Sequence, residues 1–91
     1  MTEAELKLKI RKELTEYERQ AVQGIVYTAK VKGVLLEIWR HRHNFEVCRN
    51  NTAIKLIPAN YFVGNRIDTG AITQAVNSFT NAAIAYMGGV V

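Results

Sequence analysis

Apolar residues near the start of the chain follow a helical spacing. They recur at steps of three and four residues, as expected for one face of an α-helix: Leu6, Ile10, Leu14, Tyr17 and Ala21. Thr2 and Glu5 can form a capping box in front of this stripe, and Gly24 is a suitable terminator. We therefore expect an amphipathic first helix over residues 3–23.

From Ile25 the apolar pattern changes from helical to alternating, which is typical of β-strands. Three dipeptides interrupt this pattern and each suits a two-residue hairpin turn: Lys32-Gly33, His43-Asn44 and Asn50-Asn51. The turns predict strands over residues 25–31, 34–42, 45–49 and 52–57. They also predict a register with Val31 opposite Val34, Arg42 opposite Phe45, and Arg49 opposite Thr52.

This register sorts the strand residues into two faces, because successive side chains point to opposite sides of a sheet. The predicted core face is apolar: Ile25, Tyr27, Ala29, Val31, Val34, Leu36, Ile38, Phe45, Val47, Ile54 and Leu56. The other face is mixed and pairs Glu46 with Lys55 and Trp39 with Cys48. Arg40 and Arg42 fall on the core side, where we expect them to lie beyond the helices or to extend to water.

A second helical pattern follows a connector over residues 59–67 that holds Tyr61 and Phe62. Asp68 or Thr69 can cap this helix, Gly88-Gly89 can end it, and its apolar stripe comprises Ile72, Val76, Phe79, Ala83 and Tyr86 or Met87. We therefore expect one α+β domain spanning residues 1–91. It has an N-terminal helix, a four-stranded antiparallel meander and a C-terminal helix, with both helices packed on one face of the sheet.

The exterior of the second helix is polar but uncharged, which is unusual for a helix that faces water. It is either an ordinary polar surface or a face covered by another chain, because interface cores are depleted of charge. A small core also favours self-association. We accordingly predict a homo-oligomer whose interface includes Thr73, Asn77, Thr80 and Asn81.

The charges are unevenly distributed along the chain. The sequence holds 12 basic and 8 acidic residues, a net charge of +4, and the excess lies in residues 24–67, where Glu37 and Glu46 are the only acids. The single cysteine, Cys48, excludes an internal disulfide, and the N-terminus lacks a signal-peptide pattern, so we expect a cytoplasmic protein. The amides and hydroxyls of the second helix argue against a membrane span.

The basic middle of the chain is the main functional candidate, because cations attract phosphate and an exposed aromatic ring can stack on an unpaired base. The predicted binding residues are Lys30, Trp39, Arg40, His41, Arg42, Arg49 and Lys55. An ordinary solvated basic face explains the same residues. Acids are scarce here, whereas the number of bases is near normal.

Two chemical alternatives involve the residues around Cys48. His41, His43 and Cys48 are metal-ligand types, and Cys48 with His41 resembles a nucleophile and its base. Neither set is complete, because a second ligand pair and an orienting third group are both missing from the pattern. We therefore assign no catalytic residue, metal or cofactor.

The sequence thus predicts a small, non-enzymatic, oligomeric accessory protein that binds single-stranded nucleic acid through the basic region of its sheet. The alternative is a protein-interaction, assembly or inhibitor module. Such a module would use the uncharged second helix or the face around Trp39, and its partner would be an acidic protein.

Overall fold

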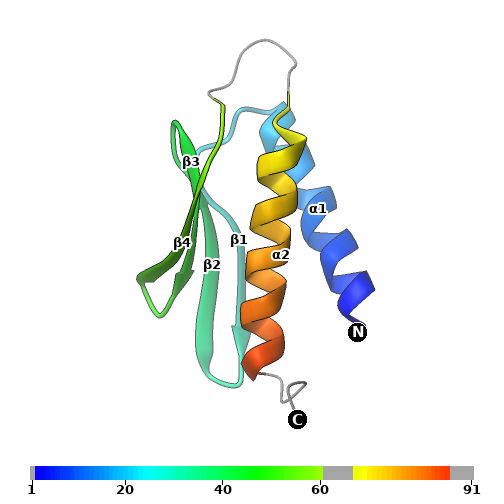
Figure 1. Ribbon diagram of the computed structural model, residues 1–91, viewed down its shortest axis with the longest axis vertical. Coiled ribbons are helices and arrows are strands. Elements are labelled where there is room, and N and C mark those ends of the chain that lie inside the picture. Colours follow the sequence, from blue (N-terminus) through cyan, green and yellow to red (C-terminus); the bar gives the residue numbers. More distant parts are fainter. Residues whose placement is uncertain (1, 61–66, 87–91) are drawn as a thin grey trace.

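The computed structural model describes residues 2–60 and 67–86 of the chain (Figure 1). Two helices flank four strands, in the order α1 (Glu3–Arg19), β1 (Gly24–Val31), β2 (Val34–Arg40), β3 (Asn44–Arg49), β4 (Thr52–Pro58) and α2 (Thr69–Tyr86). The strands form one antiparallel sheet in the order β1-β2-β3-β4, which is a simple meander.

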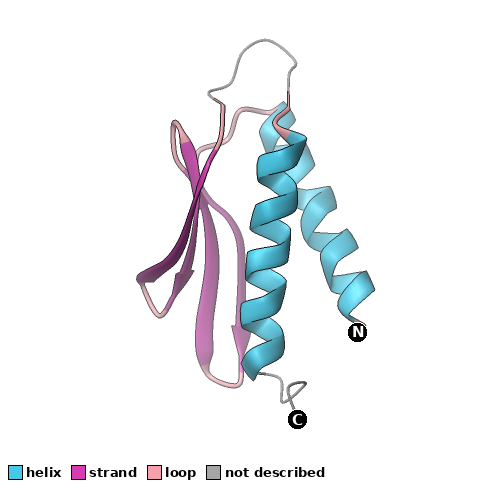
Figure 2. Ribbon diagram, in the orientation of Figure 1, coloured by secondary structure: helices cyan, strands magenta, loops and turns pink. Residues whose placement is uncertain are grey.

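Both helices pack on the same face of the sheet, so the molecule has two layers (Figure 2). α1 contacts β1, whereas α2 contacts β2, β3 and β4, and the two helices also contact each other. The predicted α+β architecture is therefore confirmed. Among the described residues, neither helix combines the length and apolar character needed to cross a membrane.

The core lies between the sheet and the helices. It is built from the helical stripes and the inward-facing strand residues, of which the most completely buried are Ile10, Leu14, Leu36, Ile38, Phe45, Val47, Ile57, Ile72, Ala75, Val76 and Phe79. Tyr27 extends this core with an edge-to-face contact to Phe79, with ring centroids 5.1 Å apart.

The helix boundaries follow local capping. Thr2 and Glu5 form the predicted capping box, and Asp68 caps α2 by accepting a hydrogen bond from the Ala71 amide at 3.0 Å. α1 ends at Arg19 rather than shortly before Gly24, because Ala21 adopts a left-handed conformation with φ of 53° and turns the chain early. The predicted terminator Gly88-Gly89 and the residues Tyr61 and Phe62 lie outside the described residues.

The first and third hairpin turns were predicted correctly. Val31 pairs with Val34 and Arg49 pairs with Thr52, and all four turn residues, Lys32-Gly33 and Asn50-Asn51, have positive φ. This conformation matches the twist of a two-residue hairpin. The prediction for the middle turn was wrong, since Arg42-His43 occupies its centre, and Phe45 pairs with Arg40 rather than Arg42.

Two bulges move apolar residues from the predicted core face to the opposite face. In β1 the register shifts at Val26, which is buried, while Ile25 is 47% exposed. In β4 the shift falls at Ile54, so that Ile57 is buried and Leu56 is 61% exposed. The predicted pairs Glu46 with Lys55 and Trp39 with Cys48 are replaced by Glu46 with Leu56 and Trp39 with Glu46. An extra residue inverts the faces beyond it, which a simple alternation misses.

Candidate functional site

Arg40, a predicted binding residue, has a fully buried side chain. Its Nε donates to Glu18 Oε1 at 2.7 Å, and its other nitrogens donate to the backbone oxygens of His41 and Asn60. The guanidinium also lies 5.0 Å from the centroid of the Phe45 ring. These contacts lie inside the protein rather than beyond the helices, so Arg40 is a structural residue that cannot reach a phosphate on the surface.

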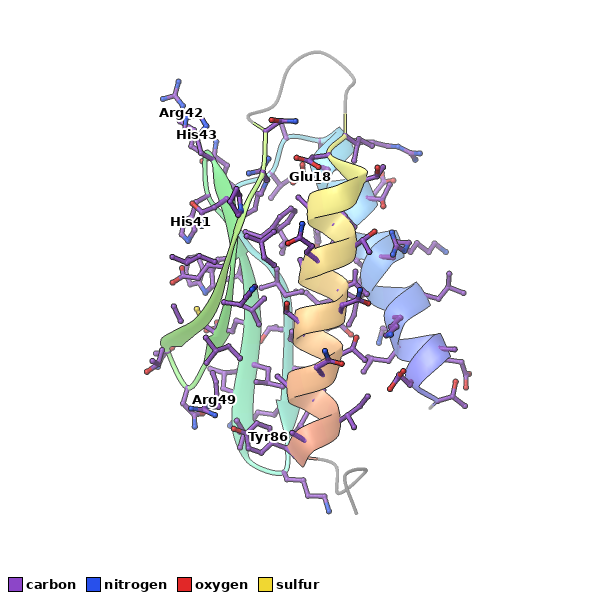
Figure 3. The ribbon with its side chains drawn as sticks, in the orientation of Figure 1. Glu18, His41, Arg42, His43, Arg49 and Tyr86 are labelled. Atoms are coloured by element: carbon purple, nitrogen blue, oxygen red, sulfur yellow. The ribbon has the colours of Figure 1, made fainter. Side chains whose placement is uncertain are left out.

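The other predicted basic residues do not form one surface. Arg42 lies with His43 at the tip of the β2–β3 turn, beyond the helices (Figure 3). Lys30 is exposed on β1 and lies opposite Leu35. Arg49 and Lys55 lie on the helix side of the sheet, beside α2. The basic middle of the sequence is therefore divided among separate parts of the fold.

A groove between α2 and β4 brings together three of the predicted residues, Arg49, Lys55 and Asn81. It has a volume of about 400 Å³, and Ile54, Ala82, Ala85 and Tyr86 contribute apolar lining. Arg49 Nη1 donates to Tyr86 Oη at 2.8 Å, which links β3 to the last turn of α2 (Figure 3). No carboxylate occurs among the described residues that line this groove, so it is positively charged.

The predicted interface residues of α2 occupy different environments. Thr80 is fully buried and donates to the Val76 carbonyl, so the prediction that it lies on an oligomer surface was wrong. Thr73 accepts a hydrogen bond from Arg11 of α1, whereas Asn77 and Asn81 are exposed. The helix lacks charge partly because it contacts both the sheet and the neighbouring α1.

The face of the sheet that the helices leave uncovered carries exposed apolar side chains. Ile25 pairs with Trp39, Trp39 pairs with Glu46, and Glu46 pairs with Leu56, so these four residues form one row across all four strands. Ile25 and Leu56 are 47% and 61% exposed. We call this row with its neighbours Leu35 and Glu37 the open face.

A hollow of about 280 Å³ lies in the open face and is lined by Glu37, Trp39, His41, Glu46, Cys48 and Asn51. His41 points away from the helices (Figure 3), and its Nε2 lies 2.7 Å from Glu46 Oε1. The rings of Trp39 and His41 stack with centroids 5.9 Å apart and planes 6° apart. The hollow is thus lined by two carboxylates and two aromatic side chains, and no Lys or Arg among residues 2–60 and 67–86 lines it.

The hollow does not favour the chemistry considered for Cys48 and His41. Burial raises the pKa of the Cys48 thiol, and the nearby charges of Glu46 and Glu37 raise it further, which disfavours the nucleophilic thiolate. His41 is hydrogen-bonded to Glu46 rather than to the thiol. Among residues 2–60 and 67–86, no three metal-ligand side chains are gathered in one place.

The sequence interpretation placed Glu37 and Leu56 in no site. Glu37 stood out only as one of two acids in a basic segment, and that scarcity was the available signal. Leu56 was assigned to the core by the unbroken register with Arg49 opposite Thr52, which the bulge at Ile54 changes. Alternation alone cannot decide which of the adjacent apolar residues Leu56 and Ile57 points inward. Tyr86, which contacts Arg49, was assigned only to the helical stripe.

We compared the chain with protein-family models, with curated proteins and with solved structures, and none of the three comparisons gave a match.

Proposed function

We propose that the protein is a non-enzymatic protein-interaction module and that the open face is its binding surface. The supporting observation is the row Ile25, Trp39, Glu46 and Leu56 on the side of the sheet without helices, in which Ile25 and Leu56 are exposed and Trp39 is partly exposed. Large apolar side chains that are exposed near one another, with polar residues among and around them, are typical of interaction sites. An aromatic residue at the centre of such a patch supplies much of the binding energy.

The negative charge of the open face favours a basic partner. Glu37 and Glu46 lie beside the apolar row, and Lys30 is the one cation whose strand position falls on this face among the described residues. Opposite charges across an interface favour encounter and fix its register. The partner is therefore a protein segment that carries both apolar and basic side chains, in place of the acidic partner expected from the net charge.

The test uses a short fluorescein-labelled peptide of alternating leucine and arginine, and measures binding by fluorescence anisotropy. Leu56→Glu should weaken binding by about tenfold or more, because docking would bury an unpaired charge. Leu8→Glu is the matched control, since Leu8 is a similarly exposed leucine, at 69%, but lies on α1. A peptide of alternating leucine and glutamate should bind more weakly than the basic one.

Equal binding by the Leu56→Glu and Leu8→Glu proteins would refute this function. Sedimentation of the protein alone should accompany the assay, because the predicted homo-oligomer could use the same face. An oligomer that Leu56→Glu dissociates and Leu8→Glu preserves would identify a second copy as the occupant of the open face and would displace the basic partner.

The groove between α2 and β4 favours a second candidate function, binding of single-stranded nucleic acid. Arg49 and Lys55 line it without a carboxylate among the described residues, and phosphate contacts by such cations are salt-sensitive. A mixed-sequence oligonucleotide should bind at low salt, and the Arg49→Gln, Lys55→Gln double variant should bind less tightly. Lys9→Gln, Lys12→Gln on α1 is the control of equal charge, and equal loss in both proteins would show non-specific attraction.

A further inference from the structure

Glu37 is a nearly buried carboxylate whose partner is missing. Its residue is 7% exposed, yet no hydrogen bond or ion pair to its carboxylate occurs among the described residues. No described side-chain oxygen or nitrogen is both sealed from solvent and unpartnered, so the carboxylate must open toward the hollow that it lines. An ionised carboxylate accepts hydrogen bonds at both oxygens, so Glu37 can accept them from a molecule that enters the hollow.

The second carboxylate of the hollow behaves differently. Glu46 Oε1 is held 2.7 Å from His41 Nε2, and the Glu46 side chain also interacts with the Cys48 thiol. Its hydrogen-bonding capacity is therefore partly used within the protein. Glu37 keeps its full capacity to accept hydrogen bonds, and its backbone is held in β2 between the buried residues Leu36 and Ile38.

The wall of the hollow suits a planar cation. Trp39 and His41, whose rings stack on each other, both line it, and a guanidinium can stack on an aromatic ring while donating two parallel hydrogen bonds to a carboxylate. An ammonium can pair with Glu37 as a point charge but cannot make the forked contact. The pKa of the Cys48 thiol, raised by burial and then by both glutamates, is consistent with a negative potential here.

We propose that the hollow is a guanidinium-binding site in which Glu37 accepts the forked hydrogen bonds and the Trp39 ring stacks on the cation. The inference rests on the proposed function, because the hollow lies within the open face and would receive an arginine side chain of the partner. A free small molecule with the same guanidinium group would satisfy the same chemistry.

Lys30 is the internal residue that could occupy the site instead, since it lies diagonally across from Glu37 on the neighbouring strand. No ion pair between Lys30 and Glu37 occurs among the described residues, so Lys30 Nζ lies farther than 4.0 Å from the Glu37 oxygens. If Lys30 did fill the site, Lys30→Gln would strengthen guanidinium binding several-fold. On our assignment it leaves the affinity within about twofold.

The experiment follows the fluorescence of Trp39, the only tryptophan, during titration with N-acetylarginine amide and with its citrulline analogue, which has nearly the same shape without the charge. Arginine should bind at least about tenfold more tightly, in line with the strength of charge-assisted hydrogen bonds. Glu37→Gln should abolish this preference, whereas Glu16→Gln on α1 should preserve it. Arginine and citrulline are then compared again as residues within the leucine-containing peptide.

Each result bears on the assignment. Equal binding of arginine and citrulline to the unaltered protein, or a preference that survives in Glu37→Gln, overturns it, and the first of these needs no variant to fold. Binding of the free amide supports a small-molecule ligand, whereas a preference seen only within the peptide supports an arginine side chain of a partner. If Leu56→Glu weakens the peptide while Glu37→Gln leaves its arginine preference intact, the guanidinium site fails and the interaction surface stands.

Discussion

Two carboxylates on opposite sides of the sheet are almost equally buried, yet only one is paired. Glu18 is 6% exposed and meets Arg40 on the helix side, whereas Glu37 is 7% exposed on the open face and has no ion-pair partner among the described residues. Burial alone therefore does not separate a structural carboxylate from one that is available to a ligand. The separation comes from whether the fold itself supplies the complementary donor.

The first prediction tests the paired carboxylate on the helix side through the substitution Glu18→Gln. This variant leaves the fully buried guanidinium of Arg40 without its counter-charge, and removing one member of a buried pair costs about 3–5 kcal/mol. Urea unfolding measures the loss. Glu16→Gln, which removes an exposed pair with Arg19, should cost less than about 1 kcal/mol. A similar small loss for Glu18→Gln would show that the Arg40 contact contributes little to the fold.

The second prediction tests which residues of β4 belong to each side. Ile57→Ala should destabilise the protein by about 2–4 kcal/mol, because it opens a cavity in the core, whereas Leu56→Ala should change stability by less than about 1 kcal/mol. The two free energies of unfolding are compared directly. If Leu56→Ala were the more destabilising change, Leu56 rather than Ile57 would face the core. β4 would then pair without the bulge, and Leu56 would not belong to the open face.

The elements and most of the turn chemistry were predictable from the sequence. Helical periodicity, the Thr2 cap and the two hairpin turns with positive φ are local properties, and local residues decide them. The bulges at Val26 and Ile54 were not predictable, because each depends on which of two adjacent apolar residues fits the core beneath the helices. This choice is made by tertiary packing rather than by the alternation itself.

The candidate site was less predictable than the fold. Arg40 was expected to reach water from the core side as part of the basic region, and Thr80 was expected on the polar exterior of its helix, but the fold buries both with internal partners. Trp39 and His41 were identified as site residues and do line one hollow. The importance of Glu37 depends on a missing donor, and no sequence pattern reveals that.

The third prediction compares how the loss of each carboxylate, Glu37 or Glu18, changes the stability of the protein. Glu37→Gln should leave stability unchanged or raise it by up to about 1 kcal/mol, because the charge that it removes has no ion-pair or hydrogen-bond partner among the described residues. Urea unfolding in the absence of arginine derivatives measures this difference. A loss comparable to that of Glu18→Gln would indicate that Glu37 has a structural role. A stability gain together with lost arginine preference is the combination expected of a ligand-binding residue.

The last prediction concerns Cys48, because the pKa of its thiol depends on the electrostatic potential in the hollow. Burial is the main cause that raises its pKa, followed by Glu46 and Glu37. At mildly alkaline pH the thiolate fraction is therefore reduced, and Glu37→Gln should lower the thiol pKa toward its usual value. Alkylation by iodoacetamide should consequently be about twofold faster in the variant. The signal is specific, because the chain has one cysteine.

The pH dependence separates this electrostatic effect from a simple opening of the structure. As the pH rises well above the thiol pKa in both proteins, both thiols become almost fully ionised, and the ratio of their alkylation rates should fall to about one. A faster reaction caused by greater access to Cys48 would persist at every pH, and that result would contradict a negative field from Glu37. The Glu16→Gln protein should react at the unaltered rate throughout. A ratio that declines with pH would therefore place the charge of Glu37 in the hollow, where the guanidinium is proposed to bind.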